Sequence, residues 1–200
     1  MRANGRTFTE SGRRAQIVSA AIETIAEVGY QQASFAKIAK RAGLSSTGMI
    51  SYHFAGKDDL VCAVSEEIVA TATAFMQERI GAAEGRPARL RAYIESNMDV
   101  VAAHPAHLRA LLGIIAAAQG AVGGLQVDTS VLSARIERLE AELRDGQAAG
   151  DFGEFDPSVM ALAITGAIDA LVASRTGASA EVLARSGAEL ADLFLRATAT

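Results

Sequence analysis

A short apolar stripe that ends in a glycine constrains the fold more than any other feature of the sequence. Its side chains recur at the spacing of one helix face: Phe35, Ile38, Ala39 and Ala42. Ser34 precedes the stripe, where its side-chain oxygen can cap the first free amides of a helix. Gly43 follows it, and glycine ends a helix with a positive φ angle at the lowest cost. The pattern therefore predicts a short helix and a sharp turn.

A second short helix is predicted directly after this turn. Leu44 can pack back on the first helix, and three hydroxyl residues can cap the second: Ser45, Ser46 and Thr47. The second helix runs to about Phe54 and buries Ile50 and Phe54, while the small Ala39 lets the two helices cross closely. Two short helices with a glycine turn and an apolar lock describe a helix-turn-helix.

The second helix of such a unit enters the major groove of DNA, and its first turn meets base edges. We predict that Ser45, Ser46, Thr47 and Tyr52 read bases, and that Ser34, His53, Lys57 and Arg14 position the unit on phosphates. Gly48 permits close approach and Ser51 can donate a hydrogen bond. The predicted DNA-binding residues are Arg14, Ser34, Ser45, Ser46, Thr47, Gly48, Ser51, Tyr52, His53 and Lys57.

The charge distribution supports a polyanion partner at the N-terminal end. Up to Lys57 the chain has eight basic and three acidic residues, a net +5, whereas the remainder has 11 basic and 20 acidic residues, a net −9. All three lysines lie in the basic part. Ordinary solvated surface charge is the alternative, but the basic part coincides with the helix-turn-helix.

At these residues the sequence resembles the TetR family of bacterial transcriptional regulators. The family pattern has Ser or Thr before the first helix, an Ile-Ala-x-x-Ala-Gly-[Val/Leu]-Ser turn, an aromatic-rich second helix ending in Phe, and Lys-[Asp/Glu]-x-Leu. The chain matches at Ser34, Ile38-Ala39, Ala42-Gly43-Leu44-Ser45, Tyr52-His53-Phe54 and Lys57-Asp58-Asp59-Leu60. It departs by one extra residue before Phe54 and by Ser51, where Tyr is usual. The resemblance covers the N-terminal part, and the rest matches in length and helical character.

The remaining sequence predicts an all-α chain of about nine helices with no convincing strand. We expect an arm over 1–9 and a helix that Ser11 caps and Gly29 ends. A long helix follows from Lys57 to about residue 83, and Pro87, Pro105 and Pro157 each open a helix. Further helices are predicted from residue 129 or 130, from 157 to about 176, and from 179 to about 197. The predicted domains are a helix-turn-helix domain over 1–56 and a helical ligand-binding and dimerisation domain over 57–200.

The last two predicted helices carry more apolar surface than one chain needs to bury. The first of them is apolar nearly all round, which is typical of a helix that is covered on two sides. In the second, Gly187 and Ala191 permit close contact. The family resemblance implies a homodimer through a four-helix interface made by these two helices.

The helical body can also hold a small molecule, because its side chains combine apolar groups with a few polar ones. The candidate ligand-binding residues are Phe75, Met76, Tyr93, Asn97, Met98, Leu111, Ile115, Met160, Ile164 and Asp169. Plain core packing is the alternative for these residues, and the family resemblance favours a ligand that is apolar or weakly polar.

No group of residues in the sequence points to catalysis, a cofactor or a metal. His104 and His107 flank Pro105 without a cysteine or carboxylate at ligand spacing, and the single Cys62 is expected to be a buried thiol. The glycine-rich stretch 120–124 lacks a phosphate-binding lysine and is expected to be a loop. No uninterrupted apolar run reaches the roughly 18 residues of a membrane span, and we predict a cytoplasmic protein.

The sequence therefore predicts a cytoplasmic, homodimeric TetR-like regulator, a repressor that binds a near-palindromic duplex operator and is released by a small, mostly apolar effector. A helical-bundle protein that binds a small molecule or a partner without binding DNA is the alternative from another class. An all-helical enzyme ranks last, because the chain contains no Glu-x-x-His pair for a metal site in a helical bundle.

Overall fold

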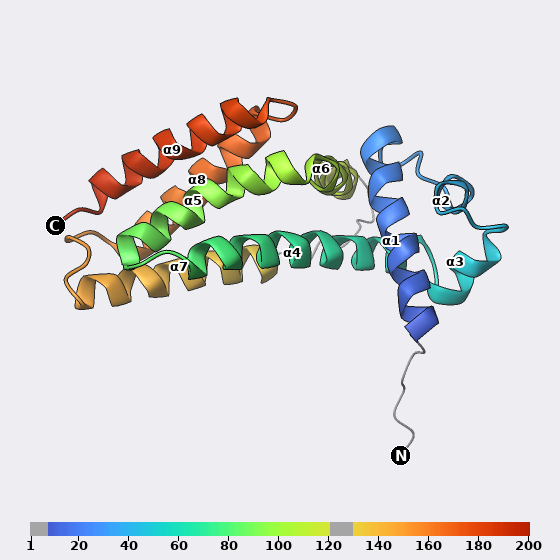
Figure 1. Cartoon of the computed structure of the whole chain (residues 1–200), viewed down its shortest axis with the longest axis horizontal. Coiled ribbons are helices and arrows are strands. Elements are labelled where there is room, and N and C mark those ends of the chain that lie inside the picture. Colours follow the sequence, from blue (N-terminus) through green and yellow to red (C-terminus); the bar gives the residue numbers. More distant parts are fainter. Residues whose placement is uncertain (1–7, 121–129) are drawn as a thin grey trace, which may run out of the picture. The chain divides into compact units, whose positions relative to one another are not determined.

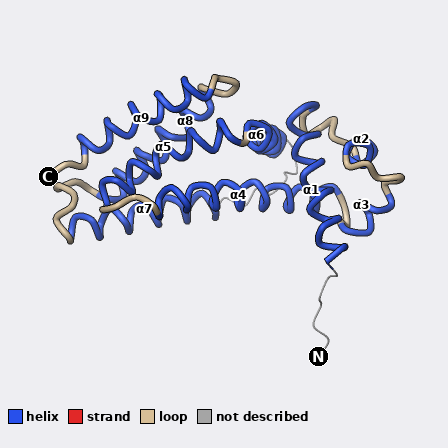
Figure 2. Tube along the Cα trace, viewed as in Figure 1, coloured by secondary structure: helices blue, strands red, loops and turns tan. Residues whose placement is uncertain are grey.

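A computed structural model of the chain describes residues 8–120 and 130–200, which form nine α-helices and no strand (Figures 1 and 2). The helices are α1 Phe8–Val28, α2 Phe35–Arg41, α3 Gly48–His53, α4 Lys57–Gly81, α5 Arg86–Ala103, α6 Pro105–Gly120, α7 Ser130–Ala148, α8 Pro157–Ser174 and α9 Ala180–Ala197. The predicted all-α class and the helix-turn-helix at the N-terminal end are confirmed. The predicted loop at 120–124 lies, beyond Gly120, outside the described residues.

The described residues form two compact units. The head unit comprises residues 8–71 and 106–120, and the body unit comprises residues 72–105 and 130–200. The predicted boundary after residue 56 thus falls inside the head unit. The reason is that the first part of α4 and the helix α6 contribute to the head core.

The head core is apolar and holds side chains from α1, α2, α3, α4 and α6. Its most completely buried members include Ile17, Ile38, Ile50, Val64 and Ile114. The small residues Ala39 and Ala42 on α2 are buried as well, as the close helix crossing requires. Complete burial of a large aliphatic side chain stabilises a fold by roughly 1.5–3 kcal/mol, so this cluster fixes the position of the short helix α3.

The turn between α2 and α3 has the predicted geometry. The Ser34 hydroxyl accepts a hydrogen bond from the Lys37 amide at 3.4 Å. Gly43 has φ +65°, and the Leu44 amide donates to the Ala39 carbonyl at 2.9 Å, which closes the helix end in the usual left-handed cap. Gln16 adds a contact from α1, because its side-chain amide donates to the Ala42 carbonyl at 2.7 Å.

Three local predictions are wrong. Helix α1 begins at Phe8 and not after Ser11, and Glu10 in its first turn suits the positive end of the helix dipole. The side chain of Thr47 makes no capping hydrogen bond to α3. Cys62 is exposed, because Leu60 and Val64 define the inner face of α4 and residue 62 lies between them on the other side.

In the body unit, α5 and α9 lie side by side, which Figure 1 shows as a green and a red helix. Gly187 allows this approach: a Cβ atom there would lie 3.0 Å from Cγ of Met98 and 3.4 Å from Cα of Glu95. Ala191, one turn further on, is completely buried. The small residues of α9 therefore serve contact with α5 of the same chain.

The connection from α7 to α8 docks on the body unit. Phe152 is buried and Phe155 half-buried, with ring centroids 6.5 Å apart. Gly146 leaves the space for the Phe152 ring, since a Cβ atom there would lie 2.2 Å from it. Asp156 then caps α8 by accepting hydrogen bonds from the amides of Ser158 and Val159. The hydrogen bond from the Ser158 hydroxyl, together with those two amides, lowers the pKa of Asp156.

Helix α8 is the most apolar element of the body unit. It buries Ala161, Ile164 and Ile168 but leaves Val159 and Leu162 exposed by 63% and 60%. With a mean hydropathy of 1.6 over 18 residues it is long and apolar enough to cross a membrane, a test that core helices of folded domains also pass.

Candidate nucleic-acid interface

Helix α3 separates an apolar inner face from a polar outer face. Ile50 and Phe54 point into the head core with at most 2% exposure. The opposite side and the turn before it are exposed and carry five of the residues that the sequence predicts to contact DNA: Ser45, Ser46, Thr47, Gly48 and Ser51. The fold thus brings these residues together on one surface.

The hydroxyl groups of this surface form no hydrogen bond within residues 8–120 and 130–200. Among the described residues, no hydrogen bond joins the side chains of Ser45, Ser46, Thr47 or Ser51 to another group. Each hydroxyl can therefore donate one hydrogen bond and accept others from a partner. Because the Thr47 side chain does not cap α3, its hydroxyl is as available to a partner as those of Ser45, Ser46 and Ser51.

Tyr52 and His53 extend this surface along α3. Tyr52 is 70% exposed, and its hydroxyl donates to a carboxylate oxygen of Glu10 at 3.2 Å. The two rings meet edge to face, with centroids 5.1 Å apart and an interplanar angle of 86°. The side chain of Tyr52 thus already has a hydrogen-bond partner, and a base or phosphate would have to compete with Glu10 for its hydroxyl.

The side chain of Arg14 packs against Phe54 at the end of α3. The guanidinium carbon lies 5.0 Å from the centroid of the Phe54 ring, a cation–π distance. Its Nε atom is buried, and none of the described residues provides a hydrogen-bond partner for it. Arg14 is therefore held in place by an aromatic ring, and no carboxylate in the described part of the chain neutralises it.

Lys57 is more constrained than the sequence indicates. Its ammonium group donates to the Tyr30 carbonyl at 2.8 Å and lies 4.2 Å from the centroid of the Tyr30 ring. Burial lowers the pKa of Lys57, and the nearby charge of Asp58 partly opposes this. Burial also raises the pKa of Tyr30, with a further increase from Asp58. Lys57 thus fixes the loop after α1, and two of its three N–H donors remain for another partner.

Sequence reasoning missed three residues of this region. Met49 is 43% exposed at the start of α3, beside the hydroxyl groups. Glu10 and Gln16 contact the helix-turn-helix from α1, through Tyr52 and the Ala42 carbonyl. The helical spacing could have predicted that Met49 is exposed, because it does not lie on the helix face of Ile50 and Phe54. The contacts of Glu10 and Gln16 join distant parts of the sequence and leave no local pattern.

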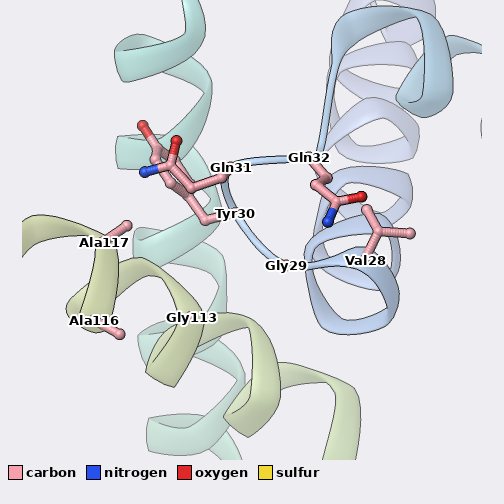
Figure 3. A pocket seen from close by; sticks show the side chains of 8 residues that line it. All are labelled: Val28, Gly29, Tyr30, Gln31, Gln32, Gly113, Ala116 and Ala117. Atoms are coloured by element: carbon pink, nitrogen blue, oxygen red, sulfur yellow. The ribbon is translucent and has the colours of Figure 1, made fainter. Parts of the chain in front are cut away.

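The head unit also has two open surface hollows. One lies between the loop after α1 and the helix α6 and is lined by Val28, Gly29, Tyr30, Gln31, Gln32, Gly113, Ala116 and Ala117 (Figure 3). The other is lined by Thr24, Glu27, Val28, Lys37, Lys40 and Arg41. Arg41 forms ion pairs with Glu27 and, at 3.2 Å, with Glu23. None of the predicted ligand-binding residues lines either hollow.

The structure divides the predicted ligand-binding residues between the two units. Leu111 and Ile115 lie on α6 in the head unit, where Leu111 packs against the apolar core. The other eight lie in the body unit, where Met98 and Ile164 are completely buried. Phe75 packs edge-on against His104, with ring centroids 5.9 Å apart. No group of three metal-ligating side chains occurs in the described part of the chain.

Two of these body residues, Tyr93 and Asp169, belong to a polar cluster between α5, α7 and α8. The body polar cluster consists of Tyr93, Arg135, Thr165 and Asp169. Nη2 of Arg135 donates to both carboxylate oxygens of Asp169, at 2.7 and 2.8 Å. Burial raises the pKa of Tyr93, while the charge of Arg135 and the neighbouring Thr165 hydroxyl act in the opposite direction. Sequence reasoning missed Arg135 and Thr165, because their proximity to Tyr93 depends on how three helices pack.

The head unit contains a helix-turn-helix, and its sequence is similar to that of known DNA-binding regulators. Residues 17–64 match the model of the bacterial regulatory proteins of the tetR family. The chain is 40% identical over 88 residues to the HTH-type transcriptional regulator BetI 1 of Chromohalobacter salexigens. The aligned segment covers 44% of this chain and 43% of that protein. The matched part spans about half the length of the curated relatives.

The fold comparison extends over almost the whole chain. The fatty acid degradation regulator FadR from Bacillus halodurans superimposes with a TM-score of 0.78 at 23% identity, over 97% of each chain. FadR from Bacillus subtilis, solved in complex with stearoyl-CoA, gives a TM-score of 0.70 at 27% identity and covers 88% of this chain and 96% of that one. The N-terminal part of the chain is therefore similar to tetR-family regulators in sequence, and nearly the whole chain is similar to solved transcriptional regulators in fold.

Proposed function

We propose that the protein is a sequence-specific DNA-binding transcriptional regulator in which α3 reads the major groove. The observation that carries this proposal is the row of exposed, unbonded hydroxyl groups on α3 and the turn before it. Serine and threonine hydroxyls hydrogen-bond to base edges and phosphates alike. The relatives bear the names of transcriptional regulators, and no catalytic activity is proposed.

Positioning on the phosphates is assigned to Arg14, Ser34, His53 and Lys57. Arg14 lacks a carboxylate partner among the described residues, and Lys57 retains two donors beyond its bond to the Tyr30 carbonyl. Ser34 accepts the Lys37 amide and keeps its hydroxyl proton for a phosphate. Tyr52 would exchange its hydrogen bond to Glu10 for one to DNA.

Two copies of the chain are proposed to associate through the outer faces of α8 and α9. Val159 and Leu162 on α8 and Leu193 on α9 are each more than half exposed, although apolar side chains of this size are usually buried. A two-fold dimer would present two head units to a near-palindromic operator, with half-sites about one helical turn, roughly 34–36 Å, apart.

A small effector bound in the body unit is proposed to release the DNA, which makes the protein a repressor that acts in the cytoplasm. Ligand control is supported by the neighbour that was solved with stearoyl-CoA. The physical requirement is that the effector binds one conformation of the dimer more tightly than the one that fits the operator. An apolar or weakly polar effector suits the body side chains.

Selection of binding sequences from a random duplex pool tests the proposed function. The full-length protein at moderate salt should recover an inverted repeat with two half-sites. Recovery of no sequence by a folded, dimeric protein would contradict DNA binding and favour a bundle that binds a ligand or a partner.

The dimer is tested separately by Leu162→Glu, which places a charge on the outer face of α8. Sedimentation should show a dimer for the wild type and a monomer for the variant. Val69→Glu provides the matched control, because Val69 is an exposed apolar residue on α4 and should leave the dimer intact. Equal behaviour of the two variants would exclude α8 from the interface.

A further inference from the structure

The body polar cluster contains more hydrogen-bond donors than the described part of the chain uses. We propose that it is the polar end of the effector site and binds an acceptor oxygen, a carbonyl or a carboxylate, of an otherwise apolar small molecule. This inference rests on the proposed ligand control and specifies the chemistry of the ligand.

The unused donors come from three helices. The Tyr93 hydroxyl on α5, the Thr165 hydroxyl on α8 and Nε of Arg135 on α7 are buried, and the only hydrogen bond within reach among the described residues is between the two hydroxyls themselves. Thr165 is only 4% exposed. Even if one hydroxyl donates to the other, one O–H and the Nε–H remain without an acceptor. Buried donors without an acceptor are unfavourable, so the cluster favours an occupant that accepts.

The carboxylate of the cluster is already engaged. Both oxygens of Asp169 accept from Nη2 of Arg135, which holds the guanidinium in place. Arg138 contributes a second positive charge near Tyr93. Of the charges that act on Tyr93, two are positive and one is negative, which suits a carbonyl or a carboxylate and disfavours a cation.

The cluster also runs from the interior toward solvent. Thr165 is buried, the Arg135 side chain is 29% exposed, and the Asp169 side chain is 54% exposed. Ile164 and Ile168 flank Thr165 on α8 and are completely buried. A ligand that bonds Tyr93 and Thr165 would therefore have its remaining atoms against apolar side chains.

Fluorine NMR on protein labelled with 3-fluorotyrosine tests this inference without DNA. The chain has three tyrosines, so Tyr30 and Tyr52 in the head unit serve as internal controls, and the Tyr93→Phe variant identifies the third signal. The probes are octanoate, 2-octanone and octylammonium, which share an apolar chain and differ in the head group. Octanoate or 2-octanone should shift the Tyr93 signal, and octylammonium should not.

Thr165→Val removes one donor and keeps the shape of the side chain. It should weaken binding of the acceptor probe about fivefold to tenfold, the loss expected for one buried hydrogen bond. Thr176→Val, an exposed threonine after α8, is the matched control and should leave the affinity unchanged. The preference between octanoate and 2-octanone distinguishes a carboxylate from a carbonyl ligand.

Either of two results would overturn the inference. The first is that neither acceptor probe moves the Tyr93 signal at its solubility limit, or that octylammonium moves it equally. The second is that Thr165→Val lowers the melting temperature of the free protein by several degrees, because the hydroxyls would then already satisfy each other or a bound water. A failed operator selection would leave both measurements interpretable, since neither uses DNA.

Discussion

The head unit and the body unit differ in how many of their basic side chains form ion pairs within the chain. In the body unit Arg79, Arg86, Arg91, Arg135 and Arg144 each form an ion pair with a carboxylate of the same chain. In the described head unit Arg41 alone forms such pairs, with Glu23 and Glu27. Arg14 lies on an aromatic ring and Lys57 on a carbonyl oxygen.

This difference indicates which unit needs an external partner for its charge. An arginine paired within the chain contributes little to binding a polyanion, because a phosphate would have to displace its carboxylate. Cations without a carboxylate partner can release counterions from DNA. The body unit has its unused donors buried at Tyr93 and Thr165, a place for a small molecule, whereas the head unit has its unused donors on the surface.

The largest expected effect concerns the separation of inner and outer faces on α3. Ile50→Ala removes a completely buried side chain and should destabilise the protein by about 2–4 kcal/mol. Met49→Ala, at the adjacent exposed position, should change stability by about 0.5 kcal/mol or less. Urea unfolding followed by circular dichroism measures both. Similar losses would mean that α3 is not oriented as described.

A smaller effect is expected where α5 and α9 touch in the body unit. Gly187→Val places atoms where Met98 already lies and should cost about 1–3 kcal/mol. Gly81 at the end of α4 has open space where a Cβ atom would lie, so Gly81→Ala should change the stability little. Thermal unfolding of the two variants compares them. A neutral Gly187→Val would contradict the close α5–α9 contact.

The unpaired arginines provide the direct comparison of the two units. Arg14→Gln should weaken binding to every duplex similarly and reduce the slope of log K against log salt by about one. Arg138→Gln is the matched control, because Arg138 is an exposed body arginine with no ion pair among the described residues. Fluorescence anisotropy over a salt series measures both slopes. A slope that changes equally for both variants would remove the distinction between the units.

The helices could be predicted from the sequence because their ends depend on local chemistry. Ser34, Gly43, Asp156 and Ser179 act at single positions as caps or turns, so α2, α8 and α9 begin or end within a few residues of the expected places. The outward side of α3 followed from the same periodicity that placed Ile50 inside.

Long-range contacts could not be predicted in this way. The packing of α6 on the head core, the Gln16 bond to the Ala42 carbonyl and the meeting of Tyr93, Arg135 and Thr165 join residues far apart in the sequence. Cys62 illustrates the limit within one helix: α4 has apolar residues on more than one side, and composition alone does not reveal which face the core takes.

The most direct test of base reading by α3 is the affinity of wild type and Thr47→Ala for every single-base variant of the selected half-site. Thr47 is exposed and its side chain makes no hydrogen bond within the described chain, so the substitution should leave stability unchanged. Base reading predicts that discrimination at one or two positions falls by about 1–3 kcal/mol while the others keep theirs. An equal loss on every variant, or no loss on any, would contradict it.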